Sequence, residues 1–117
     1  MTDFAHITPT AYLDLFASGR PFHLTLAHLV EQDDEYSKWY SRRDLSRSLM
    51  PFLNIMDNSA FEMYKQGRPM YETDKLIPMA EKVAADYVVM SDYPGHPSSK
   101  TINKAREMAP ELRQAGF

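Results

Sequence analysis

Three apolar segments, each followed by a helical pattern, are the feature that most restricts the fold of this 117-residue chain. The segments cover residues 22–30, 52–56 and 85–92, and their starts lie about thirty residues apart, the length of a strand-helix-strand unit. In such a unit a helix crosses over the sheet to connect two parallel strands. The sequence therefore predicts an α/β fold with about three parallel strands and helices outside the sheet.

Helical patterns occupy most of the chain outside these segments. Apolar side chains recur every three or four positions, and a capping residue or a stop signal lies near the ends, in residues 10–18, 35–49, 73–84 and 98–115. Pro78 is compatible with the third of these helices if it lies in or near the first turn. Gly116 is expected to end the last helix, and residues 58–72 are expected to form a loop.

Parallel strands with crossover helices build either an open doubly wound sheet or a closed eight-stranded barrel. Three strands cannot close a barrel, which usually needs about 250 residues. We therefore expect residues 1–117 to be a fragment, or a half that pairs with another chain, and both kinds of parallel sheet stay open at this point. The open edge of such a sheet would be covered by a second chain that completes the barrel, or by another copy of the chain.

Composition excludes several classes of function. The net charge of −3 argues against a protein that holds nucleic acid through an overall positive field, although a local patch is possible. The absence of cysteine excludes disulfides, thiolate zinc sites and a thiol nucleophile. No window reaches the roughly eighteen uninterrupted apolar residues of a membrane span, and the N-terminus lacks the pattern of a signal peptide. We therefore expect a cytoplasmic protein without membrane partners.

The side chains that carry chemistry are expected just beyond the strands. In both parallel folds the active site collects at the carboxyl ends of the strands. In this chain those positions are His28, residues 57–62 and residues 92–96. Asp57 and Asp92 would then share one rim, close enough to act on one small ligand, and Phe61 would lie nearby.

These residues also carry a resemblance to a known family. The stretch MDNSAFE, residues 56–62, resembles the Asp-Ser-Gly-Gly-Phe-Gln signature of tRNA-guanine transglycosylases. It is closer still to the Asp-Asn-(Ser/Gly)-Ala-Phe-Glu version in phage-borne relatives that place 7-deazaguanines in DNA. The stretch ADYVVMSDYPG, residues 85–95, resembles the next strand of that family, which also ends on an aspartate. Order and spacing agree from residue 22 to residue 116, although Ser59 and Ala60 replace two glycines.

The resemblance implies that residues 1–117 are the N-terminal portion of a TIM-type (β/α) barrel, as a single domain or a fragment. It also implies an enzyme that exchanges guanine in DNA or tRNA for a 7-deazaguanine base through a covalent glycosyl-enzyme intermediate. It assigns Asp57 as the general acid/base, Phe61 as a stacking platform and Asp92 as a hydrogen-bonding partner of the base. Glu62 replaces a glutamine that contacts the base. Asn58, Ser59 and His28 complete the candidate substrate-binding set at the same edge. The resemblance also implies the cytoplasm of a host cell if the protein is phage-encoded.

Two parts of that family are missing from this chain. The nucleophilic aspartate belongs to a later strand, and the zinc-binding Cys/His cluster follows it, so we expect this chain not to complete the reaction alone. We expect neither a metal nor a cofactor here.

Other interpretations of the same residues stay open. Asp57 and Asp92 are also typical turn residues, Phe61 is equally a core side chain, and His28 can be a core histidine. One alternative function is a non-catalytic interaction protein built on a shortened barrel. A second is a small metal-dependent hydrolase in which histidines such as His96 join the two aspartates, although no ligand spacing favours it.

Overall fold

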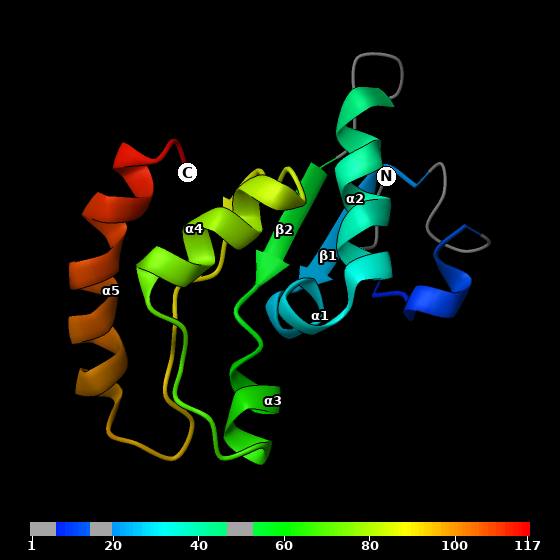
Figure 1. Cartoon of the computed structure of the whole chain (residues 1–117). Helices are drawn as coiled ribbons and strands as arrows, with labels where there is room; N and C mark the ends of the chain where they lie inside the picture. The colour runs from blue at the N-terminus through cyan, green and yellow to red at the C-terminus, as the bar shows by residue number, and fades with distance from the viewer. Residues whose placement is uncertain (1–6, 15–19, 47–52) are drawn as a thin grey trace.

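A computed structural model of the chain describes residues 7–14, 20–46 and 53–117 as a mixed α/β fold with one open, three-stranded parallel sheet (Figure 1). The strands are β1 (Phe22–Leu26), β2 (Leu53–Asp57) and β3 (Tyr87–Val88), and they are arranged in the order β1-β2-β3. The predicted fold class and the parallel strands are thus confirmed. Closure of such a sheet into a barrel stays a prediction.

The strands are in register at their carboxyl ends. Leu26, the last residue of β1, pairs with Asp57, the last residue of β2, and Met56 pairs with Val88 in β3. The ladder continues past β3, because Val89 N–H donates to the Met56 carbonyl at 3.0 Å. The segments that follow β2 and β3 therefore leave the sheet at the same edge.

Helices cover one face of the sheet. A 3₁₀ helix, η1, spans Thr10–Tyr12, and the α-helices are α1 (Ala27–Gln32), α2 (Asp34–Ser46), α3 (Ala60–Lys65), α4 (Thr73–Lys82) and α5 (Ser98–Gln114). Helices α2 and α4 lie on the covered face, and α5 packs beside α4 (Figure 1). The core between them contains apolar side chains that are at most 5% exposed, including Tyr36, Tyr40, Met56, Leu76, Ala80, Val83, Met108 and Leu112.

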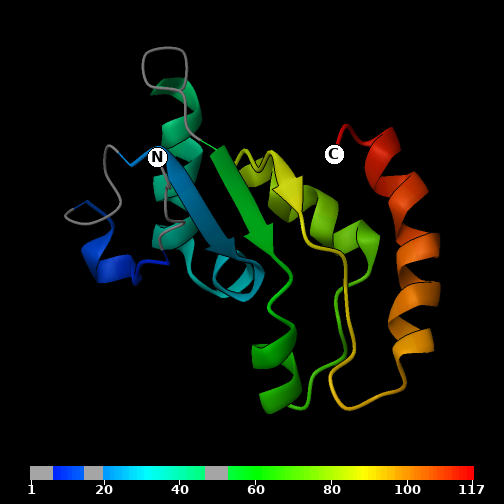
Figure 2. The same ribbon diagram turned by 180° about the vertical axis from the view of Figure 1, so that it is seen from behind.

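No described helix covers the other face of the sheet. Figure 2 shows the three strands in front of α2 and α4. Burial alternates along β1 and β2, so that every second residue is buried while its neighbours are only half-buried. Tyr87 and Val89 continue this second face and are 60% and 40% exposed. The face of the sheet left open by the described residues is therefore apolar, with Leu24, Ile55, Tyr87 and Val89 among its members.

The first strand and the second loop differ from the sequence prediction. Strand β1 ends at Leu26, so the predicted strand over residues 22–30 is too long and His28 lies in α1. Ala27 and Val30 are both buried, and this three-residue spacing suits a helix that packs on one side. The predicted loop over residues 58–72 contains α3, where Ala60 and Met63 show the same buried spacing.

The later elements also differ in detail from the sequence prediction. Only Tyr87–Val88 of the predicted strand 85–92 forms β3. Pro78 is the sixth residue of α4, beyond the first turn. It is tolerated because Pro78 and Asp74, whose carbonyl loses its helical donor, are both solvent-exposed. Residues 15–18, 47–49 and 52 of the predicted elements lie outside the described residues.

The predicted end of the last helix is confirmed. Gly116 has a φ of +99° and donates its N–H to the Arg113 carbonyl at 3.0 Å, while Phe117 N–H donates to the Leu112 carbonyl at 2.9 Å. This pair of hydrogen bonds is a Schellman motif, which favours glycine at the left-handed position. Within the described ranges, no helix is both long and apolar enough to cross a membrane.

Candidate functional site

The segment after β2 turns sharply because its own side chains bind its backbone. The Asp57 carboxylate, through Oδ2, accepts the Ser59 N–H at 3.0 Å, and Asn58 Oδ1 accepts the Ala60 N–H at 2.8 Å. Each bond joins a side chain to the amide two residues ahead, so the segment contains two consecutive Asx turns. Asp57 is therefore a turn residue, as one interpretation of the sequence predicted, and it uses one of its two carboxylate oxygens for the turn.

Ser59 links this turn to the end of β1. It has a left-handed backbone conformation, with φ of 57°, and it is fully buried at the start of α3. Its Oγ accepts the His28 N–H at 3.1 Å and lies 2.9 Å from His28 Nδ1. The Ser59 hydroxyl therefore holds the imidazole of His28 at the carboxyl edge, one strand away from Asp57.

Asn58 links the same turn to the segment after β3. Its amide group, 3% exposed, donates to the Met90 carbonyl at 2.6 Å and to Asp92 Oδ1 at 2.7 Å. Both N–H groups and the oxygen of this side chain are thus occupied. The expectation that Asp57 and Asp92 share one edge agrees with this arrangement, but only Asp57 ends a strand, because β3 ends at Val88 and Asp92 lies four residues beyond it. Asn58 positions Asp92 and has no donor left for a ligand.

Each of the two acids keeps one carboxylate oxygen for other contacts. Asp57 uses Oδ2 in the turn and Asp92 uses Oδ1 for Asn58, and neither remaining oxygen has a hydrogen-bond partner in the part of the chain that is described. Both residues are half-buried. This edge therefore presents two carboxylate oxygens to a ligand, and His28, in α1 just after β1, lies at the same edge.

The remaining predicted residues lie on α3. Phe61 is 62% exposed, and the ammonium of Lys65 lies 5.0 Å from its ring centroid. Phe61 is therefore not a core side chain, and its ring is accessible for stacking. Glu62 is half-buried in the first turn of the same helix.

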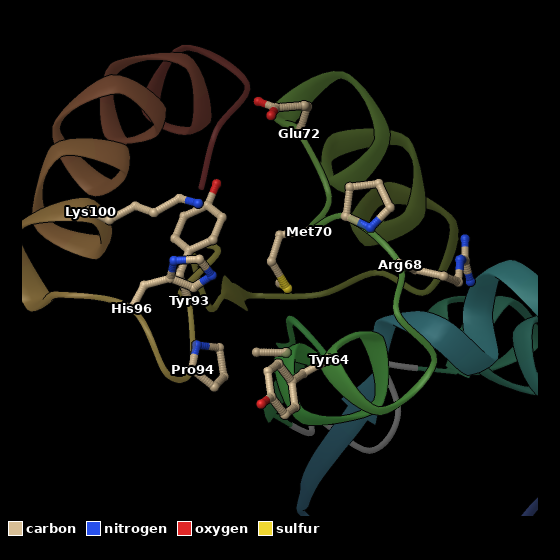
Figure 3. A pocket seen from close by; sticks show the side chains of 10 residues that line it. Tyr64, Arg68, Met70, Glu72, Tyr93, Pro94, His96 and Lys100 are labelled. Carbon is tan, nitrogen blue, oxygen red and sulfur yellow. The ribbon is translucent and has the colours of Figure 1, made fainter.

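A pocket of about 320 Å³ lies next to this edge (Figure 3). One side consists of α3 and the segment that follows it, with Tyr64, Arg68 and Met70, and the other of the segment between β3 and α5. That second segment contributes Tyr93, Pro94 and His96, and α5 contributes Lys100. Ala60 and Tyr93, which follow the turn and Asp92 directly, connect the pocket with the two acids.

Most charges around the pocket are already paired. Arg68 binds Glu31 at 2.7 Å, and Lys104 forms an ion pair with Glu72. Burial alone would raise the pKa of Glu31, but the hydrogen bonds from Arg68 and Tyr71 outweigh it and hold that pKa below its ordinary value. In contrast, Lys100 has no carboxylate within ion-pair distance among the described side chains, and its ammonium lies 4.4 Å from the Tyr93 ring centroid.

Sequence reasoning missed Tyr64 and Lys100, and it gave no role to Tyr93, which lies within the predicted edge residues 92–96. Tyr64 follows Phe61 by one helical turn and Tyr93 follows Asp92 directly, so their proximity to the acids is a signal that could have found them. Lys100 carries no such signal, because its position depends on how the segment between β3 and α5 folds back along residues 66–72.

Two negative findings complete the description of the site. The described ranges contain no group of three or more His, Asp or Glu side chains that could hold a metal ion, so the metal-hydrolase alternative gains no support from them. No protein-family model, curated protein or solved structure matches the chain.

Proposed function

We propose that the carboxyl edge of the sheet binds a purine-like base and takes part in exchanging guanine in a nucleic acid for a 7-deazaguanine. The observation that supports this proposal is the pair of half-buried acids, Asp57 at the end of β2 and Asp92 four residues beyond β3, which Asn58 holds at one edge of the sheet. Each acid has one oxygen without a hydrogen-bond partner among the described residues. The N–H groups along the edge of a purine are donors that such oxygens accept. The exposed Phe61 ring, on α3 four residues after Asp57, offers a stacking surface.

In this proposal Asp57 moves a proton and Asp92 orients the base. A carboxylate nucleophile bonds to C1′ of the nucleoside while the bond from C1′ to the guanine nitrogen breaks, and Asp57 donates a proton to the departing guanine. The incoming 7-deazaguanine then gives a proton to Asp57 and displaces the nucleophile from C1′. The exchange consumes no further reactant, because one base replaces another.

We assign no residue of this chain to the nucleophile. The open apolar face and the unpaired edges of the described sheet fit a partial TIM-type barrel whose other strands come from further polypeptide, and we propose that the nucleophile lies there. A second chain or another copy of this chain is the proposed partner, together with DNA or tRNA. Base binding by the acids of this chain does not depend on that nucleophile.

The test is calorimetric titration of the protein with guanine and with 7-cyano-7-deazaguanine. We expect at least one of them to bind, and Asp57→Asn to weaken binding about 10- to 150-fold, the equivalent of a hydrogen bond to a charged group. Asp74→Asn removes an exposed acid of α4 and is the matched control, expected to leave the affinity unchanged. If the original protein and Asp57→Asn bind the base with equal affinity, the assigned site is refuted.

The open sheet face favours one other function, that of a non-catalytic interaction protein. Apolar patches of this kind are typical of protein interfaces. In that case Tyr87→Lys on the open face would abolish association with the partner chain, measured by sedimentation, while neither base would bind. Base binding that depends on Asp57 would contradict this alternative.

A further inference from the structure

The pocket beside the acids has the composition of a site for a ring that carries a negative charge. Its walls offer two tyrosines, a methionine and two prolines, which suit a flat apolar group. Of its charged groups, Arg68 and Glu72 are neutralised by Glu31 and Lys104. The cation left without a carboxylate partner in the described part of the chain is Lys100. The pocket therefore favours an anion.

Tyr64 and Lys100 define two separate contacts within this pocket. Tyr64 is 62% exposed and projects from α3, so one face of its ring is available for stacking. Lys100 lies on the other side with His96, and both flank the Tyr93 ring, since the His96 and Tyr93 centroids are 6.2 Å apart (Figure 3). A ligand that fills the pocket would thus place a ring on Tyr64 and an anionic group at Lys100 and His96.

Gly95 brings the segment between β3 and α5 close to Tyr64. Its φ is +80°, which favours glycine, and a β-carbon at this position would lie 3.9 Å from the Tyr64 hydroxyl oxygen. Any larger side chain at position 95 would therefore extend toward the Tyr64 ring. At this position the segment between β3 and α5 approaches the Tyr64 ring with backbone atoms alone.

We propose that this pocket binds the nucleotide adjacent to the exchanged base, with its ring stacked on Tyr64 and its phosphate at Lys100 and His96. This inference rests on the proposed function, because it takes the two acids as the site of the exchanged base. The connection is direct in the chain: Tyr93 follows Asp92, and Ala60 lies two residues beyond Asn58. A strand with one base at the acids would therefore have its next nucleotide within reach of the pocket.

The experiment measures fluorescence anisotropy of a labelled single-stranded oligonucleotide, one guanine flanked by thymines in DNA or uridines in RNA. Tyr64→Ala is expected to weaken binding about 5- to 150-fold, the range for loss of one stacked base. Tyr64→Phe retains the ring and should bind nearly as well as the original protein. Tyr12→Ala removes a tyrosine of η1 that is 52% exposed, away from the pocket, and is the matched control.

The phosphate contact is tested by the salt dependence of the same binding. Lys100→Ala should reduce the slope of log affinity against log salt by about 0.7, the value for one contact to a single strand. Lys82→Ala removes an exposed lysine from the end of α4 and should leave the slope unchanged. A slope that is the same in Lys100→Ala and the original protein would overturn the phosphate assignment.

Parallel titrations separate this inference from the proposed function. If 7-cyano-7-deazaguanine binds through Asp57 but Tyr64→Ala binds the oligonucleotide as well as the original protein does, the pocket assignment is wrong and the base site stands. If the oligonucleotide depends on Tyr64 but no free base binds, the pocket is supported and the base site fails. Binding of thymidine monophosphate, but of no oligonucleotide, would show that a free nucleotide occupies the pocket and would overturn the proposal.

Discussion

Replacement of Asn58 by aspartate should destabilise the protein in a pH-dependent way. The Asn58 amide is buried and donates to Asp92 Oδ1 at 2.7 Å and to the Met90 carbonyl at 2.6 Å. Asn58→Asp keeps the shape of the side chain but replaces the donor with a carboxylate. A second negative charge then faces Asp92, and two hydrogen bonds are lost.

The magnitude follows from the geometry. Two unit charges about 4 Å apart repel each other by about 4 kcal/mol at an effective dielectric constant of about 20. Water around the half-buried Asp92 reduces this repulsion, while the loss of the two hydrogen bonds adds to the cost. We expect a net loss of about 3 kcal/mol at neutral pH, a large fraction of the roughly 5–15 kcal/mol that stabilises a domain.

The direction in which the stability of the Asn58→Asp variant changes with pH identifies charge repulsion as the cause of its loss. Repulsion raises the pKa of the new carboxyl group at position 58 in the folded state above its unfolded value of about 3.9. As the pH rises through the interval between the unfolded-state and the folded-state pKa, the unfolded state loses its proton first. The variant therefore loses stability relative to the original protein. At lower pH the carboxyl group is neutral in both states, so the repulsion disappears and only the cost of the one donor that a neutral carboxyl group cannot replace remains.

Urea denaturation at pH 4 and pH 7 measures this effect. The double variant Asn58→Asp/Asp92→Asn exchanges donor and acceptor and should recover part of the stability at pH 7. Asn103→Asp, at an exposed position of α5, is the control and should change the free energy of unfolding by less than about 0.5 kcal/mol. A loss that is the same at both pH values, or no loss at all, would refute the link between the two strand ends.

Three further predictions concern stability and are measured by chemical denaturation. Met56→Ala, at a fully buried position of β2, should lower the free energy of unfolding by about 2–5 kcal/mol. Gly116→Ala should cost about 1 kcal/mol because φ is +99° there, and an unchanged stability would contradict the helix end described. Because the pKa of Glu31 is lowered in the folded state, its carboxylate stabilises the fold at pH values above its ordinary pKa of 4.5. This contribution is lost as the pH falls through the folded-state pKa. Glu31→Gln should therefore be less stable than the original protein at pH 7 but not at pH 3; a difference that persists at pH 3 would contradict the ion pair with Arg68.

The fold class and the parallel direction of the strands were predictable because they depend on local patterns. Apolar segments about thirty residues apart require crossover connections, and these make the strands parallel. Element boundaries were less predictable, as in residues 27–30, where an apolar segment continues from a strand into a helix without a turn residue. Helix α3 was missed because Asp57, Asn58 and Ser59 read as a loop, whereas their side chains form the turn that starts it.

The site was predictable only where it depends on strand ends. Asp57 and Asp92 follow directly from the rule that parallel strands share a carboxyl edge. The role of Asn58 as a bridge, and the pocket between Tyr64 and Lys100, depend on how two long segments lie against each other. The Ser91 hydroxyl donates to the Tyr71 carbonyl at 2.6 Å and so joins those segments. No local sequence pattern predicts this long-range contact.

The most direct test of the central claim is the change in backbone amide chemical shifts when 7-cyano-7-deazaguanine is added to the protein. If the acids at the carboxyl edge bind the base, the largest shifts should fall on Asp57, Asn58, Phe61, Asp92 and Tyr93, and Asp57→Asn should diminish them. Shifts confined to α2 or to the open face of the sheet, or no shifts at all with millimolar base, would contradict the assignment of this edge as a base-binding site.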